Sequence, residues 1–432
     1  MSTSATCSAP SLATCPAPSL RAAIGHKLRH LPARFRQLRL RTPVYVLAEE
    51  GEPLAEDAAN VHPFAIGFAL VVVLLLLWRV AGRSRRATAP PPVNSALAAA
   101  AARRRENQAE TSSATPLEPI ESLAATVEQI RAYAEDYKYF NAGELLDALR
   151  EALDKRRSSP FDSDVKAATK QLDALLSDGE LEKRIKTVRQ ASRELNSDEG
   201  FEICKEDATM RMGKRLAADS TFTVKIEAVL EGVRPADTLF LWREAHLYPD
   251  WFPLITKGVH IDERPPLEAL IHAEIETWFT AADLVLHGFG CDCFARDGSM
   301  LMCVRSVRQS DVPGATLPVH PSETYKDKMI KATRVKADID ILFEPISATS
   351  VRFAFMLSHQ LNATRMPAWV ADLVLQKGMG QIFSSMKTIA VRMAADDRTC
   401  KHVPYVNSPE YQPIAKYIRN KVDGYLKTIK AK

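Results

Sequence analysis

Cysteine and histidine side chains gather in one short stretch of the sequence. The stretch contains His287, Cys291, Cys293 and Cys303. Imidazole nitrogens and thiolate sulfurs are the usual zinc ligands in proteins, so a metal site is the first chemistry to consider. Such a site requires that the thiols converge on one point.

The turn within this stretch decides whether the thiols converge. Asp297–Gly298 is the strongest local hairpin signal in the chain, because Asp-Gly favours a two-residue turn between antiparallel strands. Pairing across such a turn sets Cys293 opposite Met302 and leaves Cys303 on the other face of the sheet. We therefore expect no zinc site and interpret these cysteines as buried thiols that fill core space.

Other motifs of catalysis or cofactor binding are missing from the sequence. It has no G-x-S-x-G, no H-E-x-x-H, no Walker loop and no G-x-G-x-x-G, so we expect no cofactor and no catalytic activity. Lys and Arg number 57 against 53 Asp and Glu, too even a balance for a dedicated nucleic-acid-binding protein. Seven scattered cysteines in 432 residues indicate a reducing compartment rather than a disulfide framework.

The elements that position these residues are strands with one apolar face. Apolar and polar residues alternate along 222–228, 267–276, 336–343 and 351–357, as in an antiparallel sheet with one buried side. A helical segment, 236–246, separates the first two strands. A long amphipathic helix is expected to start at Pro367, with Ile382 and Met386 on its apolar stripe. The prediction is an α+β fold in which a curved antiparallel sheet wraps around a C-terminal helix and encloses a cavity.

Four segments resemble the START (StAR-related lipid transfer) domains of the helix-grip superfamily. They are 247–253 (Leu-Tyr-Pro-Asp-Trp-Phe-Pro), the hairpin 288–307, the strand pair 336–357, and 366–374 with its Pro-x-Trp start. The resemblance covers about residues 198–395. It implies non-catalytic binding or transfer of one lipid, such as a phospholipid, a sterol or a ceramide.

The candidate lipid-binding residues come from the apolar rows, the hairpin, the helix stripe and the tryptophan turn. They are Trp251, Ile271, Ile275, Glu276, Phe289, Arg305, Phe353, Phe355, Ile382 and Met386. Arg305 is expected on the concave face, where it would pair with a carboxylate or hold a lipid head group, because an unpaired buried arginine is costly. The alternative is a surface charge on the solvent side. Glu274 and Glu276 are its candidate partners.

The N-terminal part has a different composition. Residues 1–48 contain no Asp or Glu and carry seven Arg or Lys residues, which is typical of an organelle transit peptide, most like a plastid one, or of a disordered basic segment. Residues 64–81 are apolar except for Arg79 and predict one transmembrane helix. Acidic residues precede this span and arginines follow it, so the rest of the chain is expected on the cytosolic or stromal side of its membrane.

Three further regions flank the START-like segment. Residues 87–115 are rich in Ala, Pro and Ser and predict a linker, whereas 116–196 have helical periodicity and predict three or four helices with an unknown protein partner. Residues 396–432 are interpreted as a solvated tail with a short helix near 412–429. Two alternatives to lipid binding stay open. One is a cyclase- or hydrolase-like enzyme with an acid–base pair in the cavity, and the other is a scaffold whose cavity is filled by side chains.

Overall fold

A computed structural model describes eight stretches of the chain. They are residues 122–156, 163–207, 210–219, 221–252, 255–276, 280–324, 331–360 and 378–431. The predicted transit segment at 1–48, the span at 64–81 and the linker at 87–115 lie outside these stretches. Within the stretches, no helix combines the length and the apolar character needed to cross a membrane.

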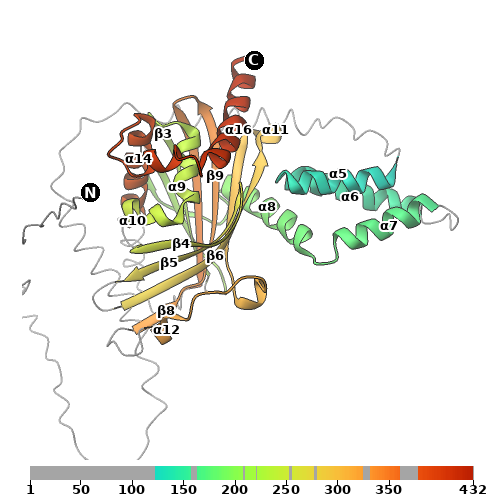
Figure 1. Cartoon of the computed structure of the whole chain (residues 1–432), viewed down its shortest axis with the longest axis horizontal. Helices are drawn as coiled ribbons and strands as arrows, with labels where there is room; N and C mark the ends of the chain where they lie inside the picture. Colours follow the sequence, from blue (N-terminus) through green and yellow to red (C-terminus); the bar gives the residue numbers. More distant parts are fainter. Residues whose placement is uncertain are drawn as a thin grey trace, which may run out of the picture. The chain divides into compact units, whose positions relative to one another are not determined.

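One antiparallel sheet forms the centre of the described structure (Figure 1). The strands follow one another across it in the order β1-β2-β3-β10-β9-β7-β6-β5-β4, and short β8 pairs in parallel with β6. Their bounds are β1 Glu202–Glu206, β2 Met210–Leu216, β3 Thr221–Glu231, β4 Lys257–Arg264, β5 Glu268–Glu276, β6 Thr280–Cys293, β7 Ser299–Ser306, β8 Lys331–Arg334, β9 Ala337–Ser347 and β10 Ser350–Gln360. All four strands predicted from alternation are confirmed.

Alternation gives the sheet two different faces. We call the inner face the one that carries Ile226, Phe353, Ile341, Val304 and Ile271, which share one hydrophobic core. The outer face carries the intervening residues, Met356, Leu342, Cys303, Cys291 and Phe289, which belong to a second core.

Helices from the middle and the end of the chain pack on the inner face. They are α9 Pro235–Arg243, η3 Ala245–Leu247, α10 Tyr248–Trp251, α14 Gly380–Ala394, α15 His402–Val406 and α16 Gln412–Ala431. A sheet closed by C-terminal helices confirms the α+β helix-grip fold that the START resemblance implied. The first part of the predicted long helix, from Pro367 to residue 377, lies outside the described residues.

The C-terminal segment belongs to the core, so its interpretation as a solvated tail is wrong. Helix α16 confirms the predicted helix, but it buries Ile414, Ala415, Ile418, Val422 and Leu426 in the inner core. Its lysines alternate with apolar residues that recur every three to four positions and form one buried stripe, so the helix reads as polar overall. The fold therefore continues past residue 395.

The described part of the predicted helical region forms four helices, two of which contact the outer face directly. They are α5 Leu123–Glu135, α6 Tyr139–Arg156, α7 Ser163–Leu175 and α8 Glu180–Asn196. Helix α8 contacts β7, β9 and β10, and α6 contacts β6. Leu146, Val188 and Leu195 share the outer core with Leu342 and Met356 of the sheet. These helices thus have a partner within the chain.

Three short elements complete the described chain, and one of them changes the predicted hairpin. They are α11 Phe294–Asp297, η4 Gln309–Asp311 and α12 Pro321–Thr324. Helix α11 replaces the expected two-residue turn and ends at Gly298, whose φ of 76° suits a residue without a side chain. Cys293 therefore pairs with Ser299 rather than with Met302. This shift of three residues moves every β7 side chain to the face opposite to the one expected.

Candidate functional site

The inner face is mostly apolar across its six central strands, and aromatic rings fill one half of it. The exception is buried Asp292 near the end of β6, which accepts a hydrogen bond from Lys421 Nζ of α16 at 2.8 Å. The Trp242 ring of α9 lies against Phe353 and Phe355 of β10, with centroids 5.9 and 5.2 Å away, and against Trp251 at 5.1 Å. The Trp242 indole Nε1 donates to Met386 Sδ of α14 at 3.1 Å. This half of the space between sheet and helices is a packed aromatic core.

The other half of the inner face is less covered by the described elements. Here the strands begin or end with apolar side chains that pack against the inner core but stay only half-buried. These residues are Phe222 of β3, Ile275 of β5, Leu284 of β6, Ile339 of β9 and Leu357 of β10. Leu357 pairs directly with Ile339, so the row is continuous across β9 and β10. We call these five residues the open row.

A polar cluster lies at the edge of the inner face, where η3 approaches β4. Glu244 is fully buried; its carboxylate contacts the Arg243 guanidinium and accepts a hydrogen bond from Tyr405 Oη at 3.0 Å. Arg243 also donates to Glu263 Oε2 at 3.0 Å. The backbones of η3 and β4 approach closely at Gly258, because a Cβ there would lie 1.8 Å from the Ala245 carbonyl oxygen. Only glycine fits at this position.

Part of this cluster has the composition of a metal site. Among the described residues, Glu244, His246 and His260 offer ligand atoms within 4.8 Å of one another. However, both Glu244 oxygens have partners, and the His260 nitrogens contact Glu263 and the Arg243 carbonyl oxygen. The Arg243 guanidinium already supplies the positive charge that the carboxylates require. The contacts favour a self-neutralised structural cluster over a cation site.

The outer face carries most of the charged residues of the central strands, and Arg305 is one of them. Its guanidinium lies 2.7 Å from Asp340 of β9 and donates to the Ile339 carbonyl oxygen at 3.1 Å. The expectation that Arg305 faces the concave side is wrong, because the hairpin register differs by three residues. Arg305 does have the carboxylate partner that its burial demands, but the partner is Asp340 rather than Glu274 or Glu276.

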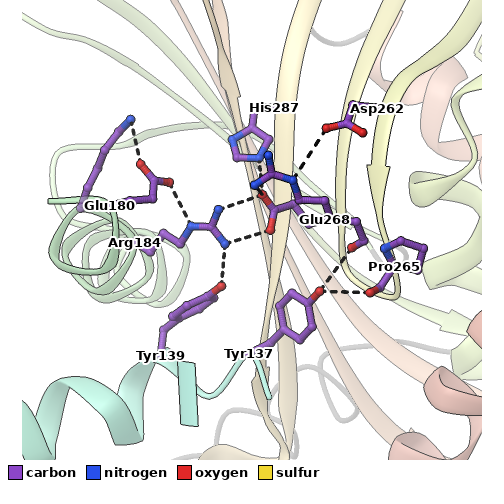
Figure 2. A network of polar contacts seen from close by, with 10 residues as sticks. Tyr137, Tyr139, Glu180, Arg184, Asp262, Pro265, Glu268 and His287 are labelled. Atoms are coloured by element: carbon purple, nitrogen blue, oxygen red, sulfur yellow. Dashed lines mark hydrogen bonds and ion pairs between the residues drawn. The ribbon is translucent and has the colours of Figure 1, made fainter. Parts of the chain in front are cut away.

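A second ion-pair network ties helix α8 to the outer face (Figure 2). Arg184 makes a two-pronged contact with Glu268 of β5, at 2.8 and 3.0 Å, and donates to Tyr139 Oη at 2.8 Å. His287 of β6 lies 2.9 Å from the same carboxylate. Burial alone would raise the pKa of Glu268, but hydrogen bonds from His287 and Arg184 and the Arg184 charge outweigh it and lower the pKa to about 2.

The three hairpin thiols lie together on the outer face. Cys291, Cys293 and Cys303 all belong to the outer core, so the expectation that Cys303 points away from the other two is wrong. Burial raises the pKa of the Cys303 thiol, and a protonated thiol is a poor metal ligand. The interpretation as core-filling thiols is retained on these grounds.

The structure divides the predicted lipid-binding residues between the two faces. Those in the inner core are Trp251, Ile271, Ile275, Phe353, Phe355, Ile382 and Met386. Phe289 belongs to the outer core, where it packs edge-on against Tyr139, and Glu276 is exposed at the end of β5, in alternation with the inner residue Ile275. The side chains of three predicted residues, Phe289, Glu276 and Arg305, therefore do not point into the predicted cavity.

Sequence reasoning missed Trp242 and the buried pair Arg243–Glu244. The signal was present, because two charged residues follow Leu239, Phe240, Leu241 and Trp242 without a break. Charges inside such an apolar helix predict a buried, paired cluster. No sequence signal linked Arg184 to Glu268, which lies 84 residues away.

Comparisons with known proteins found similarity only among solved structures. No family model and no curated protein matches the sequence. A STAR-related lipid transfer protein from Xanthomonas axonopodis is 16% identical, with a TM-score of 0.34 over 44% of this chain and 98% of that chain. Human StAR-related lipid transfer protein 5 is 13% identical, with a TM-score of 0.39 over 51% and 97%.

An enzyme of similar fold also matches. The Zhui aromatase/cyclase from Streptomyces sp. R1128 is 11% identical, with a TM-score of 0.28 over 40% of this chain and 95% of that chain. With identities below 20% and TM-scores below 0.5, these matches carry no information on the function of this chain.

Proposed function

We propose that the chain binds one lipid in the space over the open row and carries out no chemistry on it. The observation that carries this proposal is the open row itself. Five apolar side chains of one continuous face stay half-buried while the rest of the same face is closely packed. Contact with an acyl chain or a ring system would remove this apolar surface from water, at roughly 25 cal/mol per Å².

The apolar character of the inner face favours binding over catalysis. General acid–base chemistry needs ionisable groups within reach of the substrate. The inner positions of β3, β10, β9, β7 and β5 carry aliphatic, aromatic and thioether side chains. Strand β6 adds one buried carboxylate, Asp292, which is paired with Lys421 of α16 at 2.8 Å. The ionisable groups of the polar cluster lie at the β4 edge and are bound to one another. A cyclase- or hydrolase-like activity has less support for this reason.

The packed aromatic half favours a scaffold with a filled cavity, which is the second candidate. Trp242, Trp251, Phe353 and Phe383 occupy the volume that a long ligand would need at that end. A lipid over the open row would therefore be held by part of the sheet only. Anchoring in a membrane by the predicted span at 64–81 would keep the exchange local.

Photocrosslinking tests the proposal. The full chain, purified in a mild detergent, is incubated with liposomes that contain diazirine-labelled phosphatidylcholine, sterol or ceramide, irradiated, and digested for mass spectrometry. We expect adducts on peptides that contain Leu357, Ile339 or Leu284. Adducts confined to the outer face, or none above a bovine serum albumin background, would favour the scaffold.

A pair of variants locates the ligand. Leu357→Trp adds bulk to the open row and is expected to lower lipid crosslinking at least tenfold. Val391→Trp adds the same ring to α14, where Val391 is 39% exposed, and is expected to leave crosslinking unchanged. Equal crosslinking in the two variants would contradict a site over the open row.

A further inference from the structure

Three polar groups of aromatic side chains lie where α9, α10 and α14 meet, and two of them have partners. Tyr248 Oη donates to the Trp242 carbonyl oxygen at 2.6 Å, and Trp242 Nε1 donates to Met386 Sδ at 3.1 Å. The third, Trp251 Nε1, is buried and has no hydrogen-bond partner among the described residues. Trp251 itself is 2% exposed and belongs to the inner core.

A buried indole N–H without an acceptor is expensive. Leaving a buried donor unsatisfied costs about 1–3 kcal/mol, whereas a phenylalanine at this position would bury a ring without that cost. The Trp251 ring already packs edge-on against Trp242 and Tyr248, with centroids at 5.1 and 5.7 Å. Apolar packing thus explains a ring at this position but not its N–H.

A second unpartnered group lies on the neighbouring helix. His402 Nε2 is buried without a partner, and His402 is 1% exposed. Lys401 Nζ bonds Asp250 Oδ1 at 2.8 Å, which joins the residue before His402 to the residue before Trp251. Burial lowers the pKa of His402 to about 4, so the imidazole is neutral near pH 7. A neutral ring nitrogen is able to hydrogen-bond to an oxygen without a net charge on it.

We infer that the bound lipid reaches from the open row to this corner, formed by α10, α14 and α15, and that Trp251 Nε1 donates to one of its oxygen atoms. The inference rests on the proposed lipid binding and deepens it. The ligand class is a lipid with a hydroxyl or carbonyl oxygen in its buried part, rather than a pure hydrocarbon. The hydroxyl of a sterol and the ester carbonyl of a diacyl lipid share this chemistry.

Two pairs of lipid probes, tested on the full chain, distinguish a sterol hydroxyl from an ester carbonyl as the source of the oxygen. Cholesterol is compared with 5-cholestene, which lacks the hydroxyl, and a diacyl phosphatidylcholine with its dialkyl ether analogue, which lacks the carbonyls. Affinities are measured by displacement of a fluorescent lipid from the wild-type chain and from Trp251→Phe. The net strength of a neutral hydrogen bond predicts that Trp251→Phe weakens the oxygen-bearing member of one pair by about threefold to tenfold relative to its partner.

Trp242→Phe is the matched control. Its indole N–H is already bound to Met386, so this substitution is expected to leave the ratio within each pair unchanged. Because each ratio is taken within one variant, a loss of stability common to both probes cancels. Unchanged ratios in Trp251→Phe would overturn the inference and leave lipid binding intact. A wild-type chain that binds none of the four probes would overturn the proposed function itself.

The wild-type chain gives an independent readout if Trp251→Phe does not fold. One indole N–H proton resonance is expected to move downfield on addition of the oxygen-bearing probe and not on addition of its analogue. Identical shifts with both members of each pair would show that the Trp251 N–H bonds to water or only packs against its neighbours, and does not donate to a lipid oxygen.

Discussion

The two faces of one sheet are built from the same strands and hold their partners by different forces. On β5, the inner residues Ala269, Ile271 and Ala273 pack in an apolar core, while the outer residue Glu268 binds Arg184 of α8. On β7, inner Val304 alternates with outer Arg305, which pairs with Asp340. Charge pairs with hydrogen bonds therefore dominate the outer face. On the inner face of the described sheet they are limited to the polar cluster at the β4 edge and to the pair of Asp292 with Lys421, and contacts without direction hold the rest.

The difference follows from what each face has to hold. The outer face binds helices of its own chain in one fixed position, and ion pairs with hydrogen bonds specify such a position at a high desolvation cost. A face that admits a mobile lipid gains more from apolar contact, which tolerates sliding and varied shapes. The half-buried open row lies on this second face.

Breaking the outer network is expected to have the largest effect. Glu268→Ala leaves His287 without its carboxylate and removes the two-pronged partner of buried Arg184, which keeps only the more exposed Glu180. This predicts a loss of about 3–5 kcal/mol in the free energy of unfolding. Urea denaturation followed by circular dichroism measures it. The double variant Arg184→Met/Glu268→Met, which removes both charges, is expected to recover most of the loss. A single-variant loss below about 1 kcal/mol would show that the network does not fix α8 on the sheet.

The inner face is tested by Met386→Ala. Met386 is 1% exposed, and its truncation leaves a cavity beside Trp242, so a loss of about 2–4 kcal/mol is expected. Met386→Leu conserves the volume and is expected to cost less than about 1.5 kcal/mol. If the two variants lose equal stability, the sulfur contact with Trp242 outweighs the packing volume.

Acid is expected to weaken the outer face through the titration of Glu268. The folded-state pKa of Glu268 is about 2, below its ordinary value of 4.5, so its contribution is complete above about pH 5 and is lost as the pH falls toward 2. The expected loss is about 2–3 kcal/mol over that range. His402, with its pKa lowered to about 4, adds a loss between pH 6.5 and 4.

Glu268→Gln separates the two acid effects. The variant cannot titrate at position 268, so its stability should fall less steeply than that of the wild type between pH 5 and 2. The His402 contribution stays the same in both proteins. Parallel curves in thermal melts at each pH would contradict the role assigned to Glu268.

The smallest effect is expected for an exposed ion pair that joins β4 to β5, the strand that also carries Glu268. Lys257 and Glu274 approach to 2.9 Å, but the Lys257 side chain is 58% exposed. Solvent screening predicts that Lys257→Ala changes the free energy of unfolding by less than about 1 kcal/mol. A larger loss in urea denaturation would mean that burial does not account for the strength of the Glu268 pair.

The sequence predicted the strands well because alternation depends on neighbouring residues only. Phe353 and Phe355 were placed on the inner face correctly for this reason. Arg305 was misplaced because its face depends on a turn, and α11 inserts residues that a two-residue turn does not have. Pairings such as Arg184–Glu268 are properties of packing between distant segments, which no local pattern encodes.

Helix α16 has a consequence for how the molecule is made. It follows every described strand in the sequence, yet it completes the core that begins with β2 and β3. Synthesis runs from the N-terminus, so the ten described strands leave the ribosome while part of their apolar surface is still uncovered. The nascent chain must therefore be protected from aggregation until α16 has emerged, and a premature stop before α16 would leave an aggregation-prone product rather than a shortened working one.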